Sequence, residues 1–142
     1  MIKVRINEGE LKSIAKSFKK LITRNHKKAM LKAAATGLNR IQKRTSMSLD
    51  INEQPFRPLS EGYQAYRFKR RNQMGKKSTL IFSGRMRKSM QFSTRGQDGI
   101  IYFDSRREAE KAAMNSKIRP FFGLNRGDER AVRQAYFEGL RL

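Results

Sequence analysis

A chain of 142 residues is long enough for one compact domain, and a hydrophobic fraction of 37% indicates a modest core. The absence of cysteine excludes a disulfide scaffold, a zinc knuckle and a thiol nucleophile, and no apolar run is long enough for a signal peptide or a membrane span, so we expect a soluble protein. The net charge is +21, with 23 of the 33 basic residues in residues 1–90, and it calls for an anionic partner: nucleic acid, an anionic membrane or an acidic protein surface.

The first 50 residues predict a short strand and a long helical segment. Residues 2–6 alternate apolar and basic side chains, as a strand does. From residue 11 to residue 41, apolar residues recur every three or four positions in one continuous helical phase. The pattern fits either one helix of about 45 Å or two helices that meet at a bend near Asn25, and we favour the bend. His26 lies beside the stripe, where a single histidine is typically a packed side chain.

Two features of the helical segment bear on its contacts. Residues 33–37 (Ala-Ala-Ala-Thr-Gly) are so small that another backbone can approach, as at a helix crossing or a subunit contact, although the helix propensity of alanine alone also explains them. The segment is also a basic amphipathic helix, a type that can lie on a membrane surface, but we expect the rest of the domain to cover its apolar face. Its lysines are mostly off the stripe: Lys12, Lys16, Lys19, Lys20, Lys27, Lys28 and Lys32.

A basic and aromatic segment follows a linker at residues 45–58, and we expect a loop or arm over residues 51–79. Its rings, at Tyr63, Tyr66 and Phe68, either stack on bases or anchor the loop to the core. Its cations are candidates for contact with nucleic acid or with an acidic protein partner. They are Arg67, Lys69, Arg70, Arg71, Lys76 and Lys77.

Residues 80–90 (Leu-Ile-Phe-Ser-Gly-Arg-Met-Arg-Lys-Ser-Met) mark the change from loop to sheet. Gly84 is the expected break, because glycine adopts backbone conformations that other residues avoid. Ser83 is a candidate N-cap for a helical turn through Arg87 that passes directly into a strand.

A β-hairpin and two helices are predicted in the remainder. Residues 90–95 alternate, residues 96–99 (Gly-Gln-Asp-Gly) are a turn signal, and residues 100–103 are rich in branched and aromatic side chains. A short polar helix over residues 105–114 would be capped by Ser105, with Glu108 in the capping-box position. Pro120 bars residues 118–124 from a central strand, and Asp128 begins a last helix.

These elements predict a single α+β domain over residues 1–142. A long N-terminal helix, or a bent helix pair, would pack on a small antiparallel sheet, with a C-terminal helix and a long basic loop. Its three parts would be the strand and basic helices of residues 1–50, the basic aromatic loop of residues 51–79, and the hairpin and C-terminal helix of residues 80–142.

The order of several short motifs carries a family resemblance. A Pro-Leu pair, the basic aromatic stretch, residues 80–90, the Gly-rich hairpin, residues 119–124 (Arg-Pro-Phe-Phe-Gly-Leu) and an acid-led last helix follow one another. In this order they resemble the phage virion morphogenesis, or tail completion, family (Mu-like), over roughly residues 55–140. Residues 104–117 depart from the family, since they lack its Tyr-Ala and His-x-x-Gly, and the shape of that loop stays open.

The resemblance implies a virion structural protein for tail completion or head-tail joining, assembled in the host cytoplasm. It would form a homo-oligomeric ring, such as a hexamer, around the DNA channel, with other neck or tail proteins as partners. It would bind DNA weakly and without sequence preference, and it would need neither a cofactor nor a membrane. In this picture Gly84 and Pro120 shape the backbone, Arg119 bonds the hairpin or an acidic neighbour, and the edge at residues 2–6 extends a sheet across subunits. The residues marked for interface packing or as a structural signature are Gly84, Arg85, Met86, Arg87, Lys88, Arg119 and Pro120.

An enzyme is not favoured by the residues themselves. Hydrolysis needs convergent carboxylates or histidines, and we assign the local acids to the turn, the helix cap and ion pairs with Arg106 and Arg107. These acids are Asp98, Asp104, Glu108 and Glu110. The alternative function is a stand-alone nucleic-acid-binding protein without sequence preference, which would act as a monomer or dimer.

Overall fold

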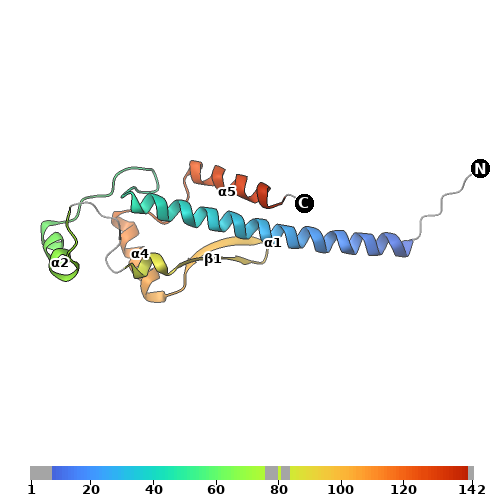
Figure 1. Cartoon of the computed structure of the whole chain (residues 1–142), viewed down its shortest axis with the longest axis horizontal. Coiled ribbons are helices and arrows are strands. Elements are labelled where there is room, and N and C mark those ends of the chain that lie inside the picture. Colours follow the sequence, from blue (N-terminus) through green and yellow to red (C-terminus); the bar gives the residue numbers. More distant parts are fainter. Residues whose placement is uncertain (1–7, 76–79, 81–83, 141–142) are drawn as a thin grey trace, which may run out of the picture.

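The structure, a computed structural model, describes residues 8–75, 80 and 84–140. The predicted strand at residues 2–6 lies outside this part. The fold class is confirmed: a two-stranded antiparallel sheet and a C-terminal helix pack against a long N-terminal helix (Figure 1). The molecule is elongated, and helix α2 (Glu61–Arg71) lies at the end remote from the start of the first helix.

Helix α1 (Glu8–Ser46) is one continuous helix of 39 residues, so the bend that we favour near Asn25 is wrong. Its length is about 58 Å. Sharp kinks need a proline or an interrupted hydrogen-bond ladder, and the sequence of α1 contains no proline. The hydroxyls of Thr23 and Thr36 donate to the carbonyls four residues earlier, at 2.8 and 2.9 Å. Both threonines therefore satisfy their hydroxyls inside the helix without ending it.

Small residues let α5 (Arg126–Gly139) and the hairpin approach α1 closely, as the run of alanines predicts for a helix crossing. Ala29, Ala33 and Ala34 are buried. A Cβ added to Gly139 of α5 would lie 2.7 Å from the Ala29 Cα. One added to Gly37 would lie 3.0 Å from a methyl group of the hairpin. The backbones of α1 and α5 therefore meet at Ala29 and Gly139 without intervening side chains.

Replacing Gly139 with alanine should lower the free energy of unfolding by about 1–3 kcal/mol, because the new methyl group would meet the α1 backbone. Urea unfolding followed by circular dichroism measures this change. Gly62→Ala in α2 is the matched control, because an added Cβ there meets nothing within 4 Å, and it should cause no loss. Equal stability of the two variants would contradict the close approach of α5 to α1.

The predicted hairpin is confirmed as strands β1 (Met90–Arg95) and β2 (Asp98–Phe103). They pair antiparallel from Met90 opposite Phe103 to Arg95 opposite Asp98, so β2 begins two residues before the predicted strand. The loop is the two residues Gly96 and Gln97, and Gly96 has φ +62°, a conformation that favours glycine at the first position of such loops.

Of the short helices, α4 has its predicted cap, and their ends differ from the predicted ones. Gly84, with φ +75°, is the N-cap of α3 (Arg85–Lys88), whereas the candidate cap Ser83 lies outside the described residues. Ser105 caps α4 (Arg106–Ile118) as predicted, accepting the Glu108 N–H at 3.4 Å, and α4 runs four residues further than expected. Helix α5 begins two residues before Asp128.

The start of α5 is a capping box that sequence reasoning missed. The Asn125 side chain accepts the Asp128 N–H at 2.9 Å, and the Asp128 carboxylate accepts the Asn125 N–H at 3.2 Å. The box lies at the end of the main core, whose largest fully buried side chains are Phe121 and Ile41. The other buried members of that core cluster are Leu38, Phe56, Met86, Met90 and Ala112.

A buried ion pair fastens this capping box to α1. Arg44 Nη1 donates to Asp128 Oδ2, and Arg44 Nη2 donates to the carbonyls of Gly123 at 2.7 Å and Phe121 at 3.2 Å. Arg40 Nε reaches Asp128 Oδ1 at 3.0 Å. Burial by itself would raise the pKa of Asp128, but the Asn125 N–H and the two guanidinium groups outweigh it, and the pKa lies below its ordinary value.

Candidate nucleic-acid interface

The basic aromatic segment, which we expect to be a loop or arm, forms the helix α2 over residues 61–71. The Ser60 hydroxyl accepts the Tyr63 N–H at 3.4 Å and begins the helix. Asn72, at φ +50°, ends it by donating its N–H to the Phe68 carbonyl at 2.9 Å. An acidic first turn and a basic last turn also suit the helix dipole. These end signals are present in the sequence, but the prolines and the dense charge favour a loop there.

The aromatic rings of α2 lie on its surface and do not anchor it to the core. Tyr63, Tyr66 and Phe68 are 42%, 47% and 53% exposed. The rings of Tyr63 and Tyr66 are stacked, with centroids 6.1 Å apart, and the Arg70 guanidinium carbon lies 5.9 Å from the Tyr66 ring centre. Such rings offer flat faces on which bases can stack beside cations that meet phosphates.

The predicted contact residues divide into three groups. Lys69, Arg70 and Arg71 are exposed together on the last turn of α2. Arg67 is only 8% exposed, and its Nε donates to Gln73 Oε1 at 3.0 Å, so it faces inward and holds the end of the helix. Lys76 and Lys77 lie outside the described residues. The structure therefore assembles a cationic cluster, Lys69, Arg70 and Arg71, beside the exposed rings.

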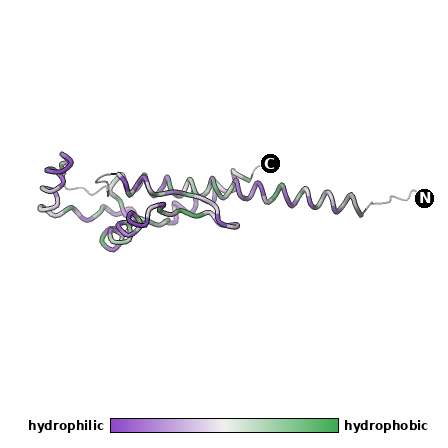
Figure 2. Tube along the Cα trace, turned by 90° about the horizontal axis from the view of Figure 1, so that it is seen from below, coloured by the Kyte–Doolittle hydropathy of each residue, from purple (hydrophilic) through white to green (hydrophobic). Residues whose placement is uncertain are grey.

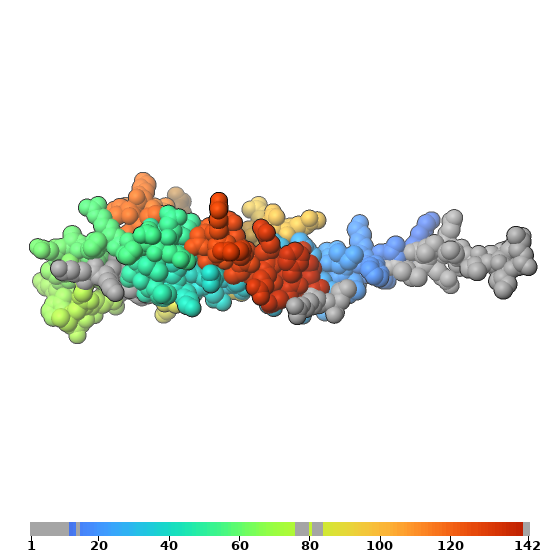
Figure 3. Space-filling model, turned by 90° about the horizontal axis from the view of Figure 1, so that it is seen from above, coloured from blue at the N-terminus to red at the C-terminus, as the bar shows by residue number. Residues whose placement is uncertain are grey.

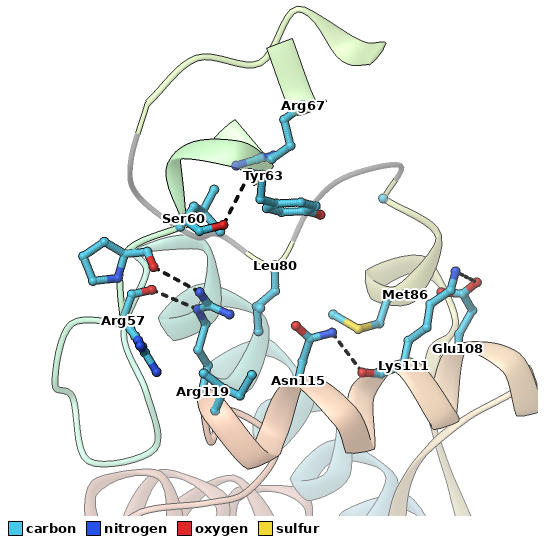
Figure 4. A pocket seen from close by; sticks show the side chains of 14 residues that line it. Arg57, Ser60, Tyr63, Arg67, Leu80, Met86, Glu108, Lys111, Asn115 and Arg119 are labelled. Atoms are coloured by element: carbon cyan, nitrogen blue, oxygen red, sulfur yellow. Dashed lines mark hydrogen bonds and ion pairs between the residues drawn. The ribbon is translucent and has the colours of Figure 1, made fainter. Parts of the chain in front are cut away.

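A pocket of about 600 Å³ separates α2 from α4 (Figure 4). Arg119 lies on its wall and donates from Nε to the Arg57 carbonyl at 3.0 Å and from Nη2 to the Pro58 carbonyl at 3.3 Å. Arg119 thus bonds the segment that leads into α2 and not the hairpin, so the predicted bond to the hairpin is wrong. A bond to an acidic neighbour stays a prediction. Burial and the nearby Arg57 lower the pKa of Arg119, against a smaller opposing effect of Tyr63.

The pocket also gathers part of the signature segment. Gly84 and Met86 line it opposite Arg119, and Met86 is 8% exposed within the core cluster, so Met86 packs inside the domain. Arg85, Arg87 and Lys88 are exposed on α3. On the pocket wall, Lys111 pairs with Glu108 at 2.8 Å. Lys69, Arg70 and Arg71 are exposed, whereas Lys111 and Arg119 are half-buried, so the surface of α2 is the better candidate site.

Pro120 directly follows Arg119, which lines the pocket. Pro120 is exposed, and its carbonyl accepts the Ile51 N–H at 2.8 Å, which ties the residues after α4 to the segment after α1. Phe121, next to Pro120, enters the core. That Pro120 shapes the backbone stays a prediction.

Of the acids assigned to structural roles, Glu108 lines the pocket beside α2 and pairs there with Lys111. Asp98 begins β2, and Glu110 pairs with Arg106 at 3.0 Å, as predicted. His26 is packed, with Nδ1 2.8 Å from the Tyr136 hydroxyl oxygen and Nε2 2.9 Å from the Gln97 carbonyl. Among the described residues, no three histidine or carboxylate side chains converge as a metal site requires. None of the described helices is long and apolar enough to cross a membrane.

No protein-family model, curated protein or solved structure matches this chain.

Proposed function

We propose that the protein is a phage virion structural protein that completes the tail or joins it to the head, as a ring subunit around the DNA channel. The observation that carries the proposal is the cationic cluster beside exposed rings on α2, at one end of an elongated molecule (Figure 1). In the ring, α2 contacts DNA through phosphates, without reading the sequence of bases. The order of motifs that resembles the tail completion family supports the same function.

The charge of the chain supports an anionic ligand. Of its 12 acidic residues, several are already used inside the domain: Asp128 with Arg40 and Arg44, Glu108 with Lys111, Glu110 with Arg106, and Glu138 with Lys32 at 3.1 Å. Packing subunits of charge +21 side by side is opposed by repulsion unless DNA or an acidic neck protein neutralises it. Ring assembly in the host cytoplasm would thus depend on such a partner.

A stand-alone nucleic-acid-binding protein is the second candidate, because exposed rings such as Tyr66 and Phe68 suit single strands, whose bases are free to stack. Such a protein would bind nucleic acid tightly as a monomer or dimer.

The oligomeric mass tests the proposal. We expect a larger, uniform species by analytical ultracentrifugation when a duplex oligonucleotide is added, or when salt screens the repulsion, and closed rings by negative-stain electron microscopy. A monomer under every condition that still binds single-stranded DNA tightly would contradict the ring and support the second candidate.

A further inference from the structure

The N-terminal half of α1 extends well beyond the rest of the domain (Figures 1 and 3). Helix α5 ends beside Ala29, which Gly139 approaches, and the hairpin loop reaches only to His26 through the Gln97 carbonyl. All described side chains among residues 12–24 are exposed. The part of α1 before His26 is about 27 Å long. We call residues 8–25 the projecting segment.

The projecting segment is amphipathic, with an exposed apolar stripe. Phe18 and Ile22, one turn apart, are each 58% exposed, and Leu21 is 44% exposed. At 3.6 residues per turn, Phe18 and Ile22 lie on the same face as Ala29, where α5 covers the helix. The stripe is thus the uncovered continuation of the face of α1 that packs against α5. In Figure 2, hydrophilic and hydrophobic residues alternate along this part of the helix.

From residue 11 onward, the charged residues of the projecting segment are all cations. From Leu11 to Leu49 the sequence has no acidic residue. A row of basic residues also recurs at every fourth position, which puts like charges next to each other on the helix surface and disfavours it by about 0.2–0.5 kcal/mol per pair. The members of that row are Lys12, Lys16, Lys20, Arg24 and Lys28.

These charges decide which occupant fits the stripe. Two projecting segments laid together would place cation rows against each other, so a second copy is disfavoured. DNA would neutralise the cations but offers no apolar surface for Phe18 and Ile22. A helix with leucines on one face and carboxylates beside them both covers the apolar stripe and neutralises the cations. Its carboxylates form opposite-charge pairs between the helices, which offset the like-charge pairs within α1.

We propose that the projecting segment binds an acidic amphipathic helix of another protein. Its apolar face would cover Phe18, Leu21 and Ile22, and its carboxylates would flank them against lysines such as Lys19. This inference is independent of DNA binding by α2, which lies at the opposite end of the molecule.

The test uses the full chain and a labelled synthetic peptide of 21 residues, with leucine at the a and d positions of each heptad and glutamate at e and g. We expect saturable binding by fluorescence anisotropy, weakened about tenfold or more by Phe18→Ser with Ile22→Ser. The matched control is Met114→Ser with Ile118→Ser, which removes an equally spaced apolar pair from α4, 68% and 56% exposed, and should leave binding unchanged. Circular dichroism and urea unfolding should show all three proteins folded to the same extent.

Several results would overturn the proposal. They are no binding by the wild-type chain, equal weakening by the two double variants, or equal binding of a peptide with glutamine in place of each glutamate. Self-association of the chain without peptide that Phe18→Ser with Ile22→Ser abolishes would identify a second copy as the occupant. Tighter binding to phosphatidylserine vesicles than to the peptide, lost in the same variant, would identify a membrane instead.

Discussion

Replacing Asp128 with asparagine is expected to lower the free energy of unfolding by about 3–5 kcal/mol at pH 7, because a buried ion pair is costly to break from one side. Asparagine has nearly the shape of aspartate but no charge. It would leave Arg44, itself 5% exposed, without its counter-charge, while Arg40 would lose a hydrogen bond to a carboxylate. Urea unfolding of the two proteins, followed by circular dichroism, measures the difference.

Glu110→Gln is the matched control for this substitution. It removes the same charge from the pair with Arg106, whose two side chains are 93% and 63% exposed, and should cost less than about 1 kcal/mol. If Asp128→Asn cost no more than Glu110→Gln, the network that joins α1 to α5 would not stabilise the fold as we argue.

The loss on Asp128→Asn should also depend on pH. The pKa of Asp128 is lower in the folded protein than its ordinary value, so the unfolded chain binds the proton more readily. The stability that this group contributes is therefore fully present above the unfolded value of about 3.9 and is lost as the pH falls through the folded value. The wild-type advantage over Asp128→Asn should shrink between pH 7 and pH 3, and a constant difference would contradict this.

Neutralising the cationic cluster of α2 should weaken DNA binding more than any other surface change of equal charge. For Lys69→Gln with Arg70→Gln and Arg71→Gln, we expect the slope of log K against log salt on duplex DNA to become less steep by about 3, since each lost phosphate contact removes about 0.9. Affinity at low salt should fall about 100-fold or more, similarly for unrelated sequences. Fluorescence anisotropy over a salt series measures both.

The control for this triple substitution lies on α5. Arg126→Gln with Arg130→Gln and Arg133→Gln removes three exposed cations from one helix and so changes the net charge equally. The affinity of this variant for duplex DNA should fall only through the general loss of long-range attraction, and its slope of log K against log salt should be nearly unchanged. Equal slopes for the two triple variants would mean that DNA does not bind at α2.

Local signals explain the parts of the fold that the sequence predicts. The hairpin depends on Gly96, and the start of α4 on the pair Ser105 and Glu108, all within a few residues of the element they define. The predicted bend near Asn25 has no such local cause and does not occur. The helix α2 has proper end signals, yet its composition alone also fits a loop, so charge and aromaticity do not decide the conformation.

Long-range contacts explain the parts that sequence reasoning missed. Arg44 and Asp128 are 84 positions apart, and nothing in either local sequence marks them as partners. The inward turn of Arg67 depends on Gln73, and the carbonyl partners of Arg119 lie 61 and 62 positions away. The cations of the candidate site can thus be found from composition, but which of them face solvent follows only from the packing.

Because α1 is one continuous helix, it fixes the distance between partners that bind at its two ends. Its projecting segment and the end that leads to α2 belong to one rod, so their separation and their relative rotation are set by residue count, at about 1.5 Å and 100° per residue. A partner held at the free end therefore stands at a fixed distance from anything bound at the other end of α1. Adding one residue to α1 would turn the stripe of Phe18 and Ile22 by more than a quarter of a circle, whereas adding seven would nearly restore its direction and lengthen the reach by about 10 Å.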